Sequence, residues 1–323
     1  MRVLVTGAGG FVGPYLIAAL RNQFGSELEL FATSKDRVPH PSVGTIEALD
    51  VCDAAAVEEI VRRVQPDHIF HLAGLAAIPK AAANVDLAWT IHLFGSLHIA
   101  RAILNNVPNS FLHHVSTGQV YGASALPGLA LDETALLAPN NTYSATKASA
   151  DLALGALAAE GLRCVRLRPF NHIGPGQSED FVVSSFAMQI ARIEAGLQEP
   201  VMRVGNLDAE RDFLDVRDIA TAYALAIKKS GELEAGTVLN IASGRPIRIR
   251  DILHRLVALS GVRIAVEQDA ARMRPSDIPR FIGDAARARQ ILGWSPKWDF
   301  ETTLTDILND ARNRVRETAS GRA

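Results

Sequence analysis

Tyr143 and Lys147 are spaced so that their side chains could cooperate in proton transfer. The run YSATK at residues 143–147 places a phenol and an ammonium four residues apart, and on a helix this spacing puts both on one face. A neighbouring cation stabilises a phenolate, so Lys147 is expected to lower the pKa of Tyr143 from about 10 toward working pH. Tyr143 could then serve as a general acid or base. Taken alone, a tyrosine and a lysine at this spacing are commonly just surface neighbours.

Thr117 offers a hydroxyl to the same site. It lies in the run VSTGQVYG at residues 115–122, which leaves the end of a strand-like segment. Ligands bind at the carboxyl ends of strands in open α/β sheets. We therefore expect Thr117 to hydrogen-bond the substrate oxygen that Tyr143 protonates, and the combination is much more specific than either part.

The run TGAGGFVG at residues 6–13 predicts a turn that holds a dinucleotide pyrophosphate. Gly7 would allow a tight turn, Gly10 would let the backbone approach the anion, and Gly13 would permit close packing of a helix on the sheet. The amides at the helix start, at Phe11 and Val12, would face the anion. A structural turn rich in glycine is the alternative.

The end of the second strand-like run indicates which dinucleotide binds. An acidic residue there would bond the ribose 2′-hydroxyl and repel a phosphate. The chain instead reads ATSK at residues 32–35, so Ser34 and Lys35 favour a 2′-phosphate and hence NADP(H). Asp36 follows closely and leaves NAD(H) open, and Lys35 could also be a solvated loop charge.

Two more strand ends complete the predicted cofactor pocket. Asp50 and Val51 follow the third strand-like run and suit contacts with the adenine amino group. Leu72, Ala73 and Gly74 end the fourth run, where small residues leave room for the cofactor backbone.

Strand and helix alternate through the first half of the chain. Strand-like runs lie at 3–6, 28–33, 45–49, 68–72, 111–116 and 163–167, and helical stretches lie at 12–23, 54–64, 87–105 and 144–159. This rhythm predicts an α/β fold with a Rossmann-like, doubly wound parallel sheet.

After Pro169 the rhythm changes. Residues 171–176 are rich in Pro, Gly and Asn and predict an irregular loop. Later elements are expected at 181–195, 201–204, 211–215, 216–228, 237–241 and 300–316. We predict a dinucleotide-binding domain at 1–168, joined by about 212–241, and a smaller mixed α/β substrate domain at 169–211 and 242–323.

Composition excludes several classes of protein. Hydrophobic residues make up 48% and charged residues 21%, which is ordinary globular usage rather than disorder. The 33 basic and 35 acidic residues give a net charge of −2, so no basic excess would hold nucleic acid or an anionic membrane. Cys52 and Cys164 are too few for a disulfide framework, and the histidines have no metal-ligand spacing. With no signal-peptide pattern and no long apolar run, we expect a soluble cytoplasmic protein without a metal.

These residues resemble the extended short-chain dehydrogenase/reductase family, which acts mostly on nucleotide sugars. The family shares the G-x-x-G-x-x-G turn, a Ser or Thr ahead of a Tyr-Gly pair, and the Y-x-x-x-K helix. The resemblance implies that Thr117, Tyr143 and Lys147 are catalytic, with Tyr143 and Lys147 also contacting the cofactor. It further implies a homodimer in which the helices near 87–105 and 144–159 pair as a four-helix bundle, and core packing is the alternative use of their apolar residues.

One position separates reactions within this family. The 4,6-dehydratases read approximately S-T-x-E-x-Y-G, and their glutamate removes the proton needed to eliminate water. Gln119 occupies that position here. Because an amide cannot cycle a proton at neutral pH, we expect dehydration by the usual route to be disabled. A cofactor-loop residue without catalytic meaning is the other interpretation of Gln119.

The second half is similar to a subfamily, the GDP-6-deoxy-D-mannose reductases. The run FNHIGPGQ at residues 170–177 carries this resemblance most specifically, with further support at 205–218 and 272–284. It implies NADPH-dependent reduction of the C4 keto group of GDP-4-dehydro-6-deoxy-D-mannose to GDP-D-rhamnose.

The expected substrate contacts are Thr117, Gln119, Asn171, His172, Val182, Arg211, Arg274 and Asp277. Arg211 and Arg274 are fork donors suited to a diphosphate, although surface ion pairs are the alternative. Asp277 would accept from a ribose hydroxyl. Arg217 and Asp218 are expected to pair within the fold instead.

Two other functions stay open. A nucleotide-sugar 4-epimerase would use the same Thr, Tyr and Lys but would retain NAD tightly. A non-catalytic redox sensor or scaffold could also use this fold, although such proteins often lose the catalytic Tyr or Lys. The Ser34-Lys35 pair favours exchangeable NADP(H), and the presence of Tyr143 and Lys147 favours an enzyme.

Overall fold

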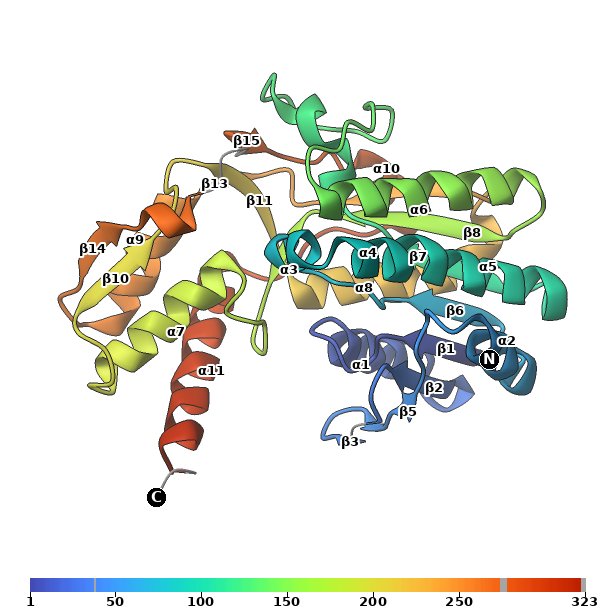
Figure 1. Ribbon diagram of the computed structural model, residues 1–323, viewed down its shortest axis with the longest axis horizontal. Coiled ribbons are helices and arrows are strands. Elements are labelled where there is room, and N and C mark those ends of the chain that lie inside the picture. Colours follow the sequence, from blue (N-terminus) through green and yellow to red (C-terminus); the bar gives the residue numbers. More distant parts are fainter. Residues whose placement is uncertain (38, 274–277, 321–323) are drawn as a thin grey trace.

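The computed structural model describes residues 1–37, 39–273 and 278–320 and contains a parallel sheet of seven strands (Figure 1). In spatial order its strands are β12 (Thr237–Ile241), β8 (Cys164–Pro169), β7 (Phe111–Val115), β6 (His68–His71), β1 (Arg2–Thr6), β2 (Glu29–Ser34) and β5 (Glu47–Ala48). The chain runs outward from β1 to β5 and then returns to β6 on the other side of β1. The crevice at the carboxyl ends of β1 and β6 is therefore the expected ligand site. The predicted doubly wound, Rossmann-like fold is confirmed.

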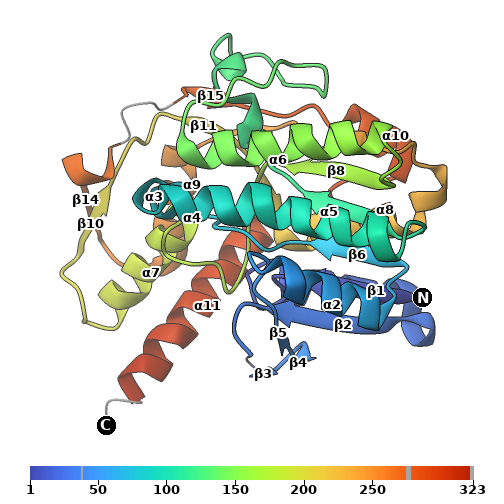
Figure 2. The ribbon, with the colours of Figure 1, turned by 45° about the vertical axis from the view of Figure 1, so that its right-hand side comes forward.

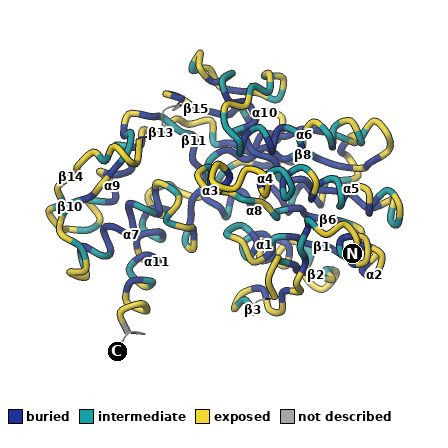
Figure 3. Tube along the Cα trace, in the orientation of Figure 1, coloured by how far each residue is buried: buried dark blue, intermediate teal, exposed yellow. Residues whose placement is uncertain are grey.

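Helices cover both faces of this sheet. One face carries α2 (Ala54–Val64), α5 (Gly95–Asn106) and α6 (Thr142–Ala159), and the other carries α1 (Gly13–Phe24), α8 (Val216–Lys228) and α10 (Ala286–Leu292) (Figures 1 and 2). Val3 and Val5 point into the core beneath α1 and α8, whereas Leu4 points into the core beneath α2 and α5. Strands β1, β6, β7, β8 and β12 are largely buried (Figure 3), whereas the edge strand β5 is exposed. Strand β1 reads as an apolar run because helices cover both of its faces.

The helix expected at 87–105 is interrupted. It consists of α4 (Val85–Trp89), a π-helical turn over Thr90–Phe94 and then α5. Within the described residues, Val85–Asn106 is the one helical stretch long and apolar enough to cross a membrane, with a mean hydropathy of 1.3. Its residues Ile99 and Ile103 are fully buried in the core shared with α2, so packing inside the protein accounts for much of this apolar character.

The second part of the chain has its own core. Helices α7 (Val182–Glu194), α9 (Ile249–Ser260) and α11 (Phe300–Ser320) pack together at the left of Figure 1. Beside them lie β10 (Val201–Val204) with β14 (Ala265–Gln268), and β11 (Glu210–Asp215) with β13 (Pro246–Arg248) and β15 (Arg280–Phe281). The division of the chain into two domains at the boundaries given above stays a prediction.

One sequence-based expectation in this part is wrong. Residues 171–173 are not irregular but form a strand, β9 (Asn171–Ile173), which pairs in parallel with β11. Pro and Gly at 174–176 end the strand rather than define the whole segment. The partner strand lies about forty residues away along the chain, so no local pattern could signal the pairing.

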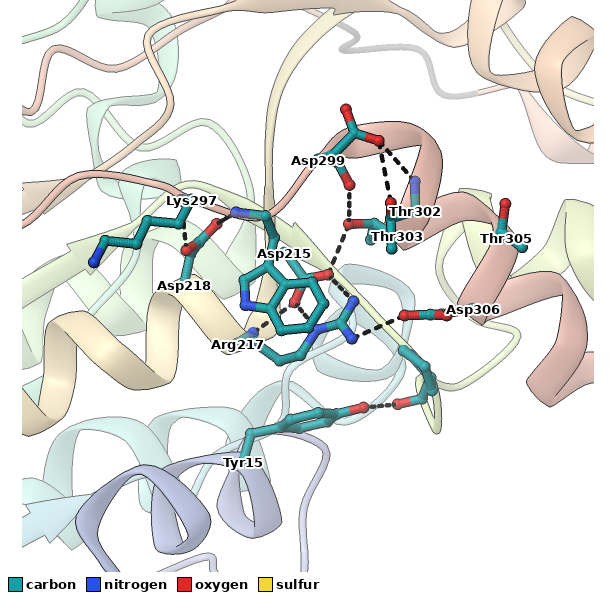
Figure 4. Close-up of polar contacts among 12 residues, drawn as sticks. Tyr15, Asp215, Arg217, Asp218, Lys297, Asp299, Thr302, Thr303, Thr305 and Asp306 are labelled. Atoms are coloured by element: carbon teal, nitrogen blue, oxygen red, sulfur yellow. Dashed lines mark hydrogen bonds and ion pairs between the residues drawn. The ribbon is translucent and has the colours of Figure 1, made fainter. Parts of the chain in front are cut away.

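A polar cluster joins the start of α8 to the C-terminal helix (Figure 4). Arg217 pairs with Asp215 at 2.6 Å and with Asp306 at 2.8 Å, and its guanidinium carbon lies 3.3 Å from the centroid of the Trp298 ring. Asp218 accepts hydrogen bonds from two backbone amides of the segment before α11. Arg217 and Asp218 thus pair within the fold, as expected.

Candidate active site

The glycine-rich turn closes on the crevice between β1 and β6. Gly7 has a φ of +71°, and a Cβ there would lie 2.6 Å from the amide nitrogen of Ala73. This contact brings the turn against Leu72 and Ala73, two residues predicted for the cofactor pocket. A Cβ on Gly13 would lie 2.1 Å from the Ala8 carbonyl oxygen, so only a glycine fits where the start of α1 meets the turn that follows β1.

The turn leaves space and donors for an anion. A Cβ on Gly10 would meet only the Gly7 carbonyl oxygen, at 3.2 Å, among described atoms within 4 Å, so the backbone there is open to an approaching ligand. Helix α1 begins at Gly13, one residue later than expected, and the described residues supply no side-chain cap at Val12. The first amides of α1 are therefore available to a phosphate. This geometry fits the predicted pyrophosphate site.

The strand ends beyond β1 also converge. A Cβ on Gly9 would lie 3.1 Å from the Ser34 hydroxyl oxygen, and the Leu49 amide donates to the Ser34 carbonyl at 2.7 Å. Asp50 has a lowered pKa, chiefly because it accepts a hydrogen bond from the Cys52 amide, with a smaller effect from the Lys35 charge. Ser34, Lys35 and Asp50 thus lie near one another at the ends of neighbouring strands, and their role in binding the cofactor stays a prediction.

Val51 and Gly74 line the same region through contacts with the neighbouring helix. The Val51 carbonyl accepts a 3.0 Å hydrogen bond from Nδ1 of His98, and a Cβ on Gly95 would meet a Val51 methyl at 3.0 Å. A Cβ on Gly74 would lie 3.3 Å from the ring of His92. The segments that contain Val51 and Gly74 are therefore held close to the helical stretch from the π-helical turn to α5.

The catalytic candidates meet at the start of α6. Asn141 caps this helix through a reciprocal capping box with Ser144, which fixes the helix start at Thr142, one residue before Tyr143. Lys147 lies one turn further on and donates a 2.6 Å hydrogen bond to the Val115 carbonyl at the end of β7. Thr117 follows that strand, and its hydroxyl hydrogen-bonds the Tyr143 phenol. The structure therefore brings Thr117, Tyr143 and Lys147 together.

The expected direction of the Tyr143 pKa is wrong for this structure. Burial raises the pKa of Tyr143, and the hydrogen bond from Thr117 opposes this only in part. Burial also lowers the pKa of Lys147 to about 8, against the opposing charge of Asp151. Both shifts have one cause, since a dry environment disfavours phenolate and ammonium alike. Tyr143 is consequently held in its protonated form.

Asp151 and Arg168 support this helix, and neither was singled out from the sequence. Arg168 donates to both carboxylate oxygens of Asp151 and, at 2.9 Å, to the hydroxyl of Tyr121. Tyr121 in turn donates to Asn240 at 2.7 Å. Burial alone would raise the pKa of Asp151, but Arg168, with smaller contributions from Ser116 and Arg166, outweighs burial and lowers the pKa. The available signal was an acid four residues after Lys147, on the same helix face.

Three of the predicted substrate residues lie on the paired strands β9 and β11. Asn171 and His172 lie on β9; Nδ1 of His172 donates to the Phe170 carbonyl at 3.0 Å, and its ring stacks on Phe11 at 6.0 Å between centroids. Arg211 lies on the adjacent β11 and donates to the Glu210 carbonyl at 2.9 Å.

The remaining predicted residues are distributed as follows. Gln119 is half-buried at the start of a 3₁₀ helix that spans Gly118–Ala125. Val182 is the first residue of α7 and is exposed. Arg274 and Asp277 lie outside the described residues. Over the described ranges, no group of three or more His, Cys, Asp or Glu side chains could hold a metal ion.

Comparisons of the sequence and of the structure with known proteins both find nucleotide-sugar enzymes. The sequence profile of the GDP-mannose 4,6 dehydratase family matches residues 4–307. The chain is 35% identical to GDP-6-deoxy-D-mannose reductase of Pseudomonas aeruginosa, over 98% of this chain and 99% of that protein. The structure of RMD from Pseudomonas aeruginosa, solved with NADPH, superposes with a TM-score of 0.84 at 33% identity, covering 97% of this chain and 99% of the other. Thermus thermophilus UDP-glucose 4-epimerase, solved with NAD, has a TM-score of 0.83 at 26% identity, covering 97% and 99%.

Proposed function

This chain belongs to the GDP-mannose 4,6 dehydratase family within the extended short-chain dehydrogenases/reductases, and from this premise we propose that it reduces the C4 keto group of GDP-4-dehydro-6-deoxy-D-mannose to give GDP-D-rhamnose. One observation carries the proposal. Thr117, Tyr143 and Lys147 meet beside the crevice, while Gln119 stands where a dehydratase needs a carboxylate. Such a site can exchange a proton with a carbonyl oxygen, and the amide at Gln119 cannot remove one from carbon as a carboxylate would.

NADP(H) is the proposed cofactor, with NAD(H) as the alternative. The relative RMD is solved with NADPH, and the epimerase relative is solved with NAD. The open backbone at Gly10, the uncapped start of α1 and the Ser34-Lys35 edge suit a dinucleotide with a 2′-phosphate. When bound, NADPH supplies the hydride that reduces C4.

The protein's own residues supply the proton. Tyr143 donates its phenolic proton to the C4 carbonyl oxygen as the carbonyl becomes an alcohol, and Thr117 hydrogen-bonds the same oxygen. A raised pKa keeps the phenol protonated beforehand, which is the form a reduction requires. Lys147, with a pKa of about 8, carries most of its charge at neutral pH and stabilises the phenolate that the transfer leaves.

The substrate's nucleotide is proposed to lie along β9 and β11. Asn171, His172 and Arg211 occupy adjacent strands there, and Val182 opens the helix that follows. Arg274 and Asp277 are proposed as further contacts from the sequence alone. Arg211 suits the diphosphate because its guanidinium fork matches phosphate oxygens.

A direct assay tests the reaction. The protein is mixed with NADPH and GDP-4-dehydro-6-deoxy-D-mannose, and the loss of NADPH absorbance and the nucleotide-sugar product are followed. Stoichiometric cofactor consumption with formation of GDP-D-rhamnose is expected. A folded protein that binds NADPH but consumes none would overturn the proposal.

A nucleotide-sugar 4-epimerase is the second candidate, favoured by the similarity to the Thermus thermophilus epimerase. The two differ in what the freshly purified protein retains. An epimerase keeps NAD through purification and needs no added cofactor, whereas the proposed reductase releases its oxidised cofactor and depends on added NADPH. A non-catalytic sensor would bind NADP(H) but turn over neither substrate.

We also propose a cytoplasmic homodimer. Val85, Leu87 and Phe94 are exposed along α4 and the π-helical turn, and Leu152 is exposed on α6. These segments lie side by side on the outer face of the protein (Figures 1 and 2). Pairing with the same helices of a second copy in a four-helix bundle would cover these apolar side chains.

A further inference from the structure

We propose that His92 is a positioning residue that holds Tyr143 and the cofactor-side loop after β6 in a fixed relation, an inference that rests on the proposed reductase function. His92 is buried and lies in the π-helical turn between α4 and α5. The edge of one ring points at the face of the other in its contact with Tyr143, with centroids 5.7 Å apart and planes at 88°.

The π-helical turn explains how this side chain reaches the site. A π turn inserts an extra residue into a helix and rotates the side chains that follow, and such turns are frequent at functional sites. Here the turn covers Thr90–Phe94, with His92 at its centre. The Ser96 hydroxyl donates to the His92 carbonyl at 2.6 Å, which secures the backbone just after the turn.

The hydrogen bonds of His92 fix which ring nitrogen carries the proton. The Leu75 amide donates to Nε2 at 2.9 Å, so that nitrogen is the acceptor and Nδ1 carries the single ring proton. Nδ1 lies 2.7 Å from Oγ1 of Thr146, and the Thr146 hydroxyl donates to the Tyr143 carbonyl at 3.0 Å. A chain of three donors therefore runs from the Leu75 backbone through His92 to the backbone of Tyr143.

The two ends of this chain belong to the two halves of the proposed site. Leu75 directly follows Leu72, Ala73 and Gly74, which are predicted to face the cofactor, and the His92 ring packs against Gly74. Thr146 lies in the first turns of α6 beside Tyr143. The His92 imidazole thus links the segment that contains Leu75 to α6, and movement of either one would break a hydrogen bond of His92.

The imidazole stays neutral at working pH, so the donors and acceptors in this series of hydrogen bonds keep their roles. Burial, with a smaller contribution from the nearby Lys147 charge, lowers the pKa of His92 to about 3. Protonated Nε2 would oppose the Leu75 amide with a second donor, whereas the neutral ring satisfies both neighbours.

Two substitutions separate the two halves of this role. His92→Asn keeps a polar group near the Nδ1 position and so retains a partner for Thr146, but it loses the bond from Leu75. His92→Gln extends a polar group toward the Nε2 position and keeps the bond from Leu75, but it loses the one to Thr146. NADPH affinity is measured from NADPH fluorescence without any sugar nucleotide, and kcat is measured in the reductase assay.

We expect His92→Asn to weaken NADPH binding about tenfold with kcat changed little, and His92→Gln to lower kcat about tenfold with NADPH affinity changed little, the size expected for one lost hydrogen bond. Thr146→Val should reproduce the His92→Gln result, and combining the two should add little. His254, exposed on α9, provides matched controls in His254→Asn and His254→Gln, which should change neither quantity.

A parallel loss of affinity and turnover in both His92 variants would indicate a merely structural histidine and overturn the proposal, as would no change in either. Thermal melts show whether a variant is folded, and Thr146→Val keeps the turnover arm decisive if His92→Gln is not. Wild-type protein that binds NADPH without reducing the sugar nucleotide would refute the proposed function alone, because the affinity difference between His92→Asn and His92→Gln still decides the role of His92.

Discussion

Arg168 holds the Asp151 carboxylate through two hydrogen bonds of 3.0 and 2.7 Å, and neither side chain is more than 4% exposed. The pair ties α6, which carries Tyr143 and Lys147, to β8 in the sheet. It also leaves a negative charge near Lys147, which raises the pKa of that lysine against the effect of burial. The folding stability of the protein and the charge of Lys147 therefore both depend on the contact between Arg168 and Asp151.

Asp151→Asn is expected to destabilise the protein by about 3–5 kcal/mol, because it leaves Arg168 buried without a charged partner. It should also move the alkaline limb of the pH–rate profile to lower pH, since Lys147 loses a favourable charge. Urea unfolding and a pH series of kcat measure the two effects. Asp208→Asn is the control, as Asp208 forms an exposed pair with Arg250 and should leave both quantities unchanged. An unaltered pH profile in Asp151→Asn would contradict the proposed coupling.

Turnover is expected to fall as the pH rises above about 8, where Lys147 loses its proton. Folding stability should respond to the same group with the opposite sign. Between about 8 and the ordinary lysine value of 10.5, the unfolded chain keeps this proton and the folded chain does not, so the contribution of Lys147 to stability rises with pH. Unfolding measured across this range, compared with Lys147→Met, isolates the contribution. A flat difference between the two proteins would refute the lowered pKa.

Tyr143→Phe is expected to lower kcat by about 10²-fold or more, because the phenol is the proposed proton donor. The phenyl ring keeps the contact with His92, so NADPH affinity and thermal stability should be nearly unchanged. Fluorescence titration and the reductase assay check both statements. Retention of most turnover would assign the proton to another group.

Gly7→Ala is expected to destabilise the protein by roughly 1–3 kcal/mol and to weaken NADPH binding, since the new Cβ meets backbone at Ala73 and φ is positive. Gly261→Ala is a matched control, because Gly261 has a φ of +69° with no described atom within 4 Å of the added Cβ. The difference between the two variants measures crowding at the crevice alone. Equal effects in both would mean that backbone conformation, rather than the approach to Ala73, requires the glycine.

Phe94→Glu is expected to convert the proposed dimer into monomers, because it places a charge on the apolar face of α4 and α6. Phe94 is 48% exposed, whereas Leu129, at 73% exposed, lies in a loop outside that face. Light scattering after size exclusion should give a dimer for wild type and for Leu129→Glu, and a monomer for Phe94→Glu. A monomeric wild-type protein would remove the four-helix bundle from the proposal.

Local signals in the sequence were sufficient to predict the parallel sheet, the glycine-rich turn and the helix that carries Tyr143 and Lys147. Strands buried on both faces read as apolar runs, as at Val3–Val5, and the glycine spacing at 7, 10 and 13 predicted a turn that the structure contains. The Tyr143–Lys147 spacing predicted a shared helix face, and Thr117 lies beside it as expected. Each of these signals depends on residues within one or two turns of each other or on one strand.

Tertiary contacts decided the rest, because burial and partner choice depend on segments far apart in the chain. The pairing of β9 with β11 made a strand of an expected loop, and Asp151 meets Arg168 from an element 17 residues away. The placement of His92 depends on a π-helical turn that the apolar pattern of its helix does not reveal. Spacing alone implied that Lys147 lowers the pKa of Tyr143, whereas burial of the folded site raises it. The sequence by itself thus determined that Thr117, Tyr143 and Lys147 share the site. Only the folded environment, through burial, determined the direction in which the pKa values of Tyr143 and Lys147 shift.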